Sequence, residues 1–242
     1  MEQSYGKNNN KWFAGNVLKA VRDFNMIEPG ETVAVGLSGG LDSAVLLYVL
    51  AYINKYSPLK FPLVAFHIKT FSDYPIEHLS DYAKSLGVPF ISHKIYGQDK
   101  GEIPKKGICY TCSRLKKGAI IKMAQEHDIK KIAFGHHAND FAETFFMNIF
   151  EHKRIEGLNP ASKLDKGNIT IIRPMIYLEK ETIIRMAEHF NIPDLSINCP
   201  YEELNKRSDY RKLLNDFGAT SNIHKPAKRI VESFYRKENE NE

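Results

Sequence analysis

The sequence predicts an α/β fold: a doubly wound, mostly parallel sheet with an N-terminal helix and a basic, helical C-terminal extension. Two observations lead to this prediction. Short apolar runs typical of buried strands alternate along the chain with longer segments whose apolar residues recur at helical spacing. Such alternation is typical of parallel sheets with helices on both faces. The 242 residues, of which 43% are hydrophobic, suffice for one substantial domain with a real core.

Five segments are predicted to be strands. Most are short runs rich in β-branched or aromatic residues, such as TVAVGL, PLVAFHI and KIAFG, and glycine, proline or charged residues bound them. The predicted strands are residues 32–37, 62–68, 89–94, 131–135 and 169–173. In a parallel sheet of this kind, ligands bind beyond the carboxyl ends of the strands.

Helices are predicted between these strands and at both ends of the chain. The predicted helices are residues 11–24, 44–53, 77–86, 113–127, 141–150 and 180–190, together with a basic helical region over residues 201–236. Pro29 and Gly30 break the chain after the first helix, and Gly87 and Pro89 end the third. We therefore divide the chain into an N-terminal helical segment (1–28), an α/β domain (29–200) and a basic helical extension (201–242).

Composition and charge limit the classes of protein to which this chain can belong. The formal net charge of +5 and the pI of about 8.9 permit an RNA or nucleotide partner. The first ten residues are polar, unlike a secretory signal, and the apolar run 44–53 is too short to cross a bilayer. These features predict a cytoplasmic protein without a membrane partner, in which cysteines are thiols or metal ligands rather than structural disulfides.

A glycine-rich loop follows the first predicted strand and opens a helix. Residues 38–43 read SGGLDS. Gly39 and Gly40 allow backbone amides to approach an anion, and Ser38 and Ser43 add hydroxyl donors. Asp42 fits a magnesium ligand or a cap on the first helical turn. An ordinary glycine-rich turn with Asp42 as N-cap is the alternative, but the strand–loop–helix setting favours phosphate binding.

Three cysteines form the second candidate site. Cys109 and Cys112 form a CxxC pair placed just before a predicted helix, and Cys199 lies in the string NCP. Inert buried thiols are one interpretation, although the CxxC spacing disfavours it for the first pair. The spacing leaves three others open: a redox pair, a zinc site completed by a histidine, and an iron–sulfur cluster with one open iron.

The string SGGLDS resembles the SGGxDS signature of the N-type ATP pyrophosphatases, also called the PP-loop family. The resemblance implies an adenine nucleotide alpha hydrolase-like fold that binds ATP and splits it to AMP and pyrophosphate. AMP is joined to a carbonyl oxygen of the substrate, which makes that oxygen a good leaving group. In such an enzyme, Asp42 would bind Mg²⁺.

Further segments are similar, in the same order, to the tRNA 2-thiocytidine synthetase family, a branch of the PP-loop enzymes. They are KAVRDFNMIEPGETVAVGLSGG, CYTCSRLKKGAIIKMA, GHHANDFAET, IIRPMIYLEKE and NCP. The resemblance implies a [4Fe–4S] cluster held by Cys109, Cys112 and Cys199. It also implies adenylation of a tRNA base, cytidine 32 in the anticodon loop, whose C2 oxygen is then replaced by sulfur. A cysteine desulfurase or free sulfide would supply that sulfur, and a homodimer is consistent with the family.

Besides Asp42, two residues are predicted to be catalytic, and both are carried over from the family. Asp140 ends the string GHHAND, where relatives commonly show GHxxDD, and it is implied to assist activation or protonation of the base. Asn139 replaces the first of those carboxylates, which puts a two-carboxylate metal site in doubt. Lys116 lies one helical turn after Cys112 and is implied to stabilise developing negative charge, although a solvated lysine is the ordinary interpretation.

The remaining candidates are binding residues. His67, Ile68 and Gly135 lie at the ends of the second and fourth strands, where relatives cradle ATP. Four basic residues are weak candidates for tRNA contacts, since a solvated helix face would look the same. These are Arg114, Lys117, Arg207 and Arg211.

Three other functions remain open from the sequence. One is thiolation of another tRNA base or of a small molecule after adenylation. Another is a cluster-bearing nucleotide sensor without turnover. The last is a zinc-containing ligase that joins an amino acid to a tRNA cytidine.

Overall fold

The computed structural model describes residues 11–69, 75–95, 108–164 and 168–196, and the short stretches 210–214, 216, 231 and 233–235. At residues 11 and 108–110 only the backbone is described. Cys199 and Arg207 lie outside these ranges, as does most of the predicted extension 201–242. The stretches of the extension that are described are helical, as predicted.

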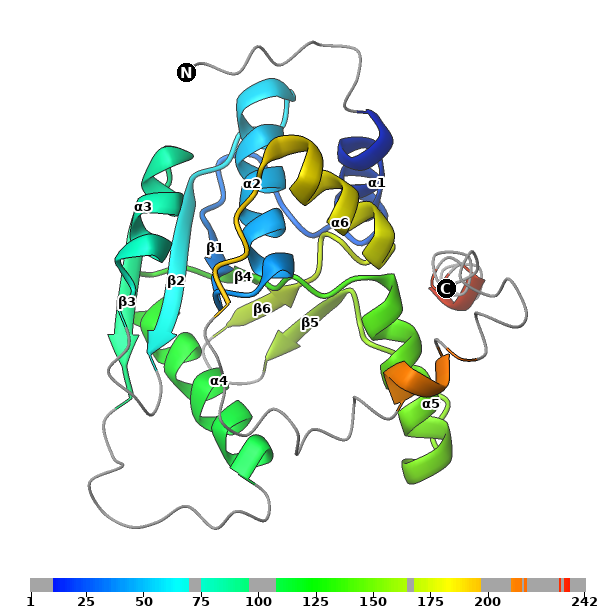
Figure 1. Ribbon diagram of the computed structural model, residues 1–242. Coiled ribbons are helices and arrows are strands. Elements are labelled where there is room, and N and C mark those ends of the chain that lie inside the picture. The colour runs from blue at the N-terminus through cyan, green and yellow to red at the C-terminus, as the bar shows by residue number, and fades with distance from the viewer. Residues whose placement is uncertain are drawn as a thin grey trace.

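Six strands form one sheet in the order β3-β2-β1-β4-β6-β5 (Figure 1). The parallel strands are β1 (Val33–Gly36), β2 (Leu63–Lys69), β3 (Phe90–Lys94), β4 (Lys131–Ala133) and β6 (Ile169–Ile172). The edge strand β5 (Ala161–Leu164) pairs antiparallel with β6. The chain runs outward from β1 to β3 and then crosses back to β4 on the other side of β1. The switch point of this doubly wound sheet therefore lies between β1 and β4.

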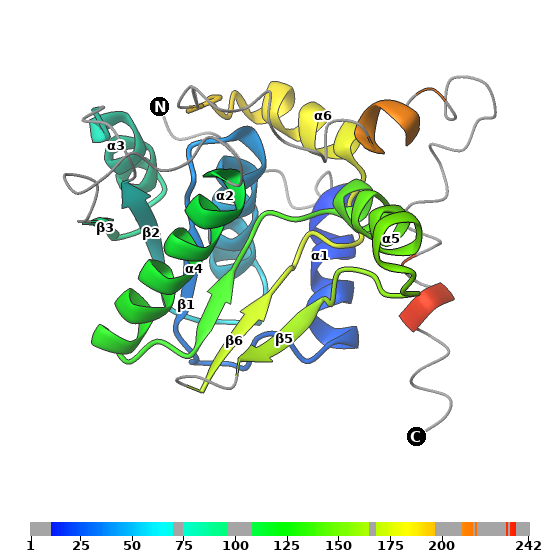
Figure 2. The same ribbon diagram turned by 90° about the horizontal axis from the view of Figure 1, so that it is seen from below.

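Helices cover both faces of the sheet. Above it in Figure 1 lie α1 (Lys11–Asp23), α2 (Leu41–Tyr56) and α6 (Lys180–Phe190), whereas α4 (Ile108–Glu126) lies below. The two remaining helices are α3 (Glu77–Ser85) beside β3 and α5 (Ala138–His152) after β4. Figure 2, seen from below, shows α4 in front of the sheet. The predicted doubly wound, mostly parallel fold is confirmed.

The alternation of side chains along β1 explains the two layers. Val33 and Val35 are fully buried in a large apolar cluster with residues of α1, α2 and α6. Ala34 points the other way, into a smaller cluster with Ile120 and Met123 of α4. Because both faces of β1 are buried, the strand is apolar throughout, as parallel strands in such sheets are.

One predicted helix start was wrong, and one strand was not predicted. Helix α4 begins at Ile108 and not at residue 113, so Cys109 and Cys112 lie within its first turns rather than before it. Ser113 is a residue type that favours helix starts, but here it lies inside the helix. Strand β5 was not predicted, because ASKL has no apolar, β-branched run. Its pairing with β6, which sets Ser162 opposite Ile171, makes it a strand.

The C-terminal stretches pack on α5. Phe234 and Tyr235 make edge-to-face contacts with Phe141, with ring centroids 5.7 and 5.8 Å apart. Phe234 also contacts Phe145 at 5.7 Å. These aromatic contacts hold part of the extension beside the helix that follows β4. Among the helices in the described ranges, none has the length and apolar character needed to span a bilayer.

Candidate functional site

The SGGLDS loop connects β1 to α2 and is held by its own serine side chains. The Ser43 hydroxyl donates to the Gly40 carbonyl oxygen at 2.7 Å. Its oxygen accepts the Ser38 N–H and the Ser38 hydroxyl, each at 3.1 Å. Gly39 has a φ of +98°, a conformation that glycine adopts readily. The loop is therefore shaped before any ligand binds, and Ser43 acts mainly within it.

A second loop, after β4, lies against the first one. A Cβ on Gly135 would lie 2.8 Å from the carbonyl oxygen of Asp42 and 3.1 Å from the backbone nitrogen of Ser43. Only glycine permits this approach, because real side chains do not come so close to backbone atoms. The structure thus brings the two loops predicted to bind ATP together at the switch point.

His67 supports the base of the first loop. Its side chain is buried, and the Nδ1–H donates to the Leu37 carbonyl oxygen at 2.8 Å. Burial lowers the pKa of His67; the hydrogen bond to Leu37 opposes this effect, and the positive charge of Lys116 reinforces it. The ring is therefore neutral at pH 7, and its Nε2 is an acceptor. Ile68, the next residue of β2, is also buried.

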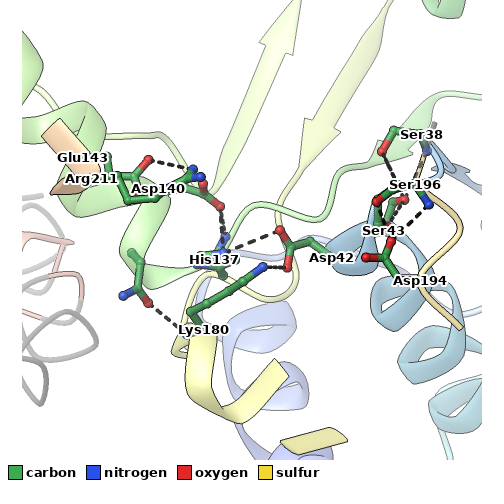
Figure 3. A network of polar contacts seen from close by, with 12 residues as sticks. Ser38, Asp42, Ser43, His137, Asp140, Glu143, Lys180, Asp194, Ser196 and Arg211 are labelled. Atoms are coloured by element: carbon green, nitrogen blue, oxygen red, sulfur yellow. Dashed lines mark hydrogen bonds and ion pairs between the residues drawn. The ribbon is translucent and has the colours of Figure 1, made fainter. Parts of the chain in front are cut away.

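Asp42 is the centre of a polar network, which Figure 3 shows. Its carboxylate lies 2.5 Å from Lys180 Nζ and 3.8 Å from His137 Nε2. The same His137 nitrogen lies 3.4 Å from Asp140 Oδ2. That oxygen also accepts the His137 backbone N–H at 2.9 Å, at the start of α5. Asp42 and Asp140, both predicted to be catalytic, are thus linked through one imidazole.

Asn139 and Lys180 were not predicted as a pair. The Lys180 backbone N–H donates to Asn139 Oδ1 at 2.9 Å, so the amide that departs from the family pattern holds the start of α6. Lys180 lies in the family-like string IIRPMIYLEKE, but a lysine at a helix start does not by itself indicate a site. Lys180 and Asp42 are 138 residues apart, so the sequence did not predict their ion pair.

Arg211, a weak candidate for tRNA contact, pairs with a buried carboxylate. Its Nε and Nη2 lie 2.8 and 3.3 Å from the two oxygens of Glu143, whose side chain is only 6% exposed. The hydrogen bond to Glu143 raises the pKa of Arg211, and the charges of Asp140 and Asp42 add to the effect. Arg211 thus compensates a buried charge on α5, and the sequence did not single out Glu143.

The cysteine pair lies at the start of α4. Cys109 and Cys112 are three residues apart in the helix, a spacing that places neighbours on one face. Cys112 is half-buried, and Lys116 lies one turn further along, exposed. Arg114 and Lys117 are exposed on the same helix. Among the described residues no group of three His, Cys, Asp or Glu side chains could hold a metal ion. Cys199 and the Cys109 side chain lie outside that set.

Sequence comparisons give related proteins over most of the chain. Residues 10–195 match the family model of the PP-loop domain. A tRNA-cytidine(32) 2-sulfurtransferase of Xanthomonas euvesicatoria is 38% identical over 83% of this chain and 68% of its own length. A tRNA-cytidine(32) 2-sulfurtransferase of Bordetella pertussis is 34% identical over 92% of this chain and 73% of its own length. The chain therefore spans roughly two thirds to three quarters of the length of these relatives.

Comparison with solved structures supports the fold. The U34-tRNA thiolase NcsA of Methanococcus maripaludis, solved with its [4Fe–4S] cluster, superposes with a TM-score of 0.75. The superposition covers 94% of this chain and 80% of that one, at 22% identity. At this identity the match shows a shared fold.

Replacing Gly135 by alanine tests the contact between the loops. The added Cβ would collide with the Asp42 carbonyl, so Gly135→Ala should lower the free energy of unfolding by about 1–3 kcal/mol and weaken ATP binding. The matched control is Gly15→Ala in α1, where a Cβ meets nothing within 4 Å. It should raise stability by about 0.5–1 kcal/mol. Urea unfolding and equilibrium dialysis with ATP measure both effects, and equal behaviour of the two variants would contradict the contact.

The buried His67 makes stability depend on pH. Its folded-state pKa lies below the ordinary value of 6.5. Stability from the neutral ring is therefore present above pH 6.5 and is lost as the pH falls through the folded-state pKa. His67→Gln, which cannot titrate, should show a shallower loss of unfolding free energy between about pH 7 and pH 5. His152→Gln, at an exposed position, serves as the control, and parallel curves for wild type and His67→Gln would refute this interpretation.

Proposed function

The chain belongs to the PP-loop family and, within it, to the tRNA-cytidine(32) 2-sulfurtransferases, and from this membership we propose that it replaces the C2 oxygen of a tRNA cytidine by sulfur at the expense of ATP. The relatives' printed name gives the substrate, cytidine 32. The observation that carries the proposal is the preformed SGGLDS loop at the switch point, with Asp42 and Asp140 beside it.

Adenylation is the first step of the proposed reaction. The C2 oxygen of the base attacks the α-phosphorus of ATP, the bond to the β-phosphate breaks, and pyrophosphate leaves. The amides of Gly39 and Gly40 and the start of α2 are positioned to stabilise negative charge on the phosphates. Asp42 would hold Mg²⁺ with the nucleotide, and Asp140 would assist proton transfer at the base.

Sulfur transfer is the second step. Sulfide attacks C2, a C–S bond forms, and the C–O bond to AMP breaks, so that AMP leaves without any net oxidation or reduction. Lys116 would stabilise the negative charge that develops. Its positive charge already contributes to the lowered pKa of His67. The base must leave its stack to enter, which costs least in an anticodon loop.

The cysteines are proposed to hold the sulfur carrier. The placement of Cys109 and Cys112 on neighbouring positions of α4 fits two ligands of one cluster. Cys199 would be the third ligand, and the structural neighbour NcsA carries a [4Fe–4S] cluster. Such a cluster would supply a vacant iron to bind sulfide. A cysteine desulfurase or free sulfide would provide the sulfur, and Arg114 and Lys117 are the exposed candidates for tRNA phosphates on α4.

Isotope transfer tests the proposal. The protein is purified anaerobically, supplied with ATP, sulfide and a tRNA carrying ¹⁸O at C2 of cytidine 32, and the products are analysed by mass spectrometry. We expect AMP, pyrophosphate and 2-thiocytidine in equal amounts, with the ¹⁸O in AMP. Cys112→Ser should abolish 2-thiocytidine, and a tRNA with uridine at position 32 serves as the substrate control.

Two results would contradict the proposal. AMP without ¹⁸O would show that the C2 oxygen is not the atom activated. Full thiolation by Cys112→Ser would show that the CxxC pair does not take part in sulfur transfer.

A further inference from the structure

We propose that Lys180 is a phosphate-binding residue of this site, which neutralises Asp42 until ATP binds and then contacts the triphosphate. The inference rests on the proposed use of ATP. It adds to that function a cation from the far end of the α/β domain, which neither the loop motif nor the cysteines indicate.

The position of the ammonium group is the first argument. Lys180 Nζ lies 2.5 Å from Asp42 Oδ1. Asp42 is the second residue of α2 and follows the Gly39–Gly40 turn after one residue. Figure 3 shows the ammonium beside the Asp42 carboxylate, in the first turn of the helix whose N-terminus is proposed to bind phosphate. The Lys180 side chain is 36% exposed, so one side of it faces open space.

The backbone that carries Lys180 is fixed to the loop after β4. The Lys180 N–H donates to Asn139 Oδ1 at 2.9 Å, and the Ala138 N–H donates to the Leu178 carbonyl oxygen, also at 2.9 Å. These two hydrogen bonds join the starts of α5 and α6. Lys180 can therefore exchange partners by rotating its side chain while its backbone stays in place. Asn139 is a positioning residue in this arrangement.

The negative charges of the site also favour a phosphate-binding role for Lys180. Asp42 and Asp140 would repel a triphosphate that enters beside them, because like charges a few ångströms apart disfavour each other. Arg211 is already engaged with the buried Glu143. Among the described cations, Lys180 is the one whose ammonium contacts a carboxylate of the loop. The pair is partly exposed, and such ion pairs contribute little net stability, so exchange of Asp42 for phosphate costs little.

A double-mutant cycle separates phosphate binding from a mere counterion role. Lys180→Met, Asp42→Asn and the double variant are compared with the wild type by equilibrium dialysis with ATP and with adenosine. We expect Lys180→Met to weaken ATP binding on the order of tenfold or more, as expected for a lost charge-assisted hydrogen bond. The loss should persist in the Asp42→Asn background, and adenosine binding should change little.

Further variants guard against a structural explanation. Lys180→Arg should restore most of the ATP affinity, and Asn139→Ala should lower it in the same direction by a smaller factor. Lys163→Met, at an exposed position of β5, is the control for loss of a positive charge and should behave as wild type. Thermal unfolding of each variant confirms that it is folded.

The outcomes separate the inference from the proposed function. If Lys180→Met loses ATP affinity in the wild-type background but not in the Asp42→Asn background, Lys180 acts only through Asp42 and the inference is wrong. Equal losses for ATP and adenosine would likewise overturn it, because they would reflect a loosened site. Failure of the wild type to bind ATP at all would overturn the proposed function together with the inference.

Discussion

The backbone of Gly135 lies against the first turn of α2, and the geometry of the site depends on this contact. It joins the loops that follow β1 and β4, the two strands between which the sheet changes direction. Because no Cβ separates them, the carboxylate of Asp42 comes within reach of His137 and, through it, of Asp140. Ligand sites at a switch point are common in doubly wound folds. Here the absence of a Cβ on Gly135 sets how closely the two loops approach.

Charge compensation then determines what can bind there. Two acidic groups of the site meet a partner from a distant part of the chain: Asp42 meets Lys180 on α6, and Glu143 meets Arg211 in the C-terminal extension. In the Glu143–Arg211 pair the Glu143 carboxylate is buried, so loss of Arg211 would leave a buried, uncompensated negative charge. The Asp42 pair is partly exposed and can exchange. The first pair therefore fixes α5, while the second is suited to respond to a nucleotide.

The sequence predicted the sheet and the SGGLDS loop between a strand and a helix, because both rest on local patterns: apolar runs, glycines and strand-to-helix order. It did not predict β5, whose pairing with β6 is non-local. It placed the start of α4 too late, since CYT lacks the apolar spacing of the later turns. The contacts of Lys180, Asn139 and Glu143 were not predicted, because each side chain gains its role from a partner 41 to 138 residues away, which no spacing rule reveals.

A structure of this chain with a non-hydrolysable ATP analogue would show directly whether ATP binds at the β1/β4 switch point. We expect the triphosphate to lie against the amides of Gly39 and Gly40, with Lys180 turned from Asp42 toward a phosphate oxygen. A triphosphate held elsewhere, for example by Arg114 and Lys117 on α4 with residues 38–43 empty, would contradict this expectation.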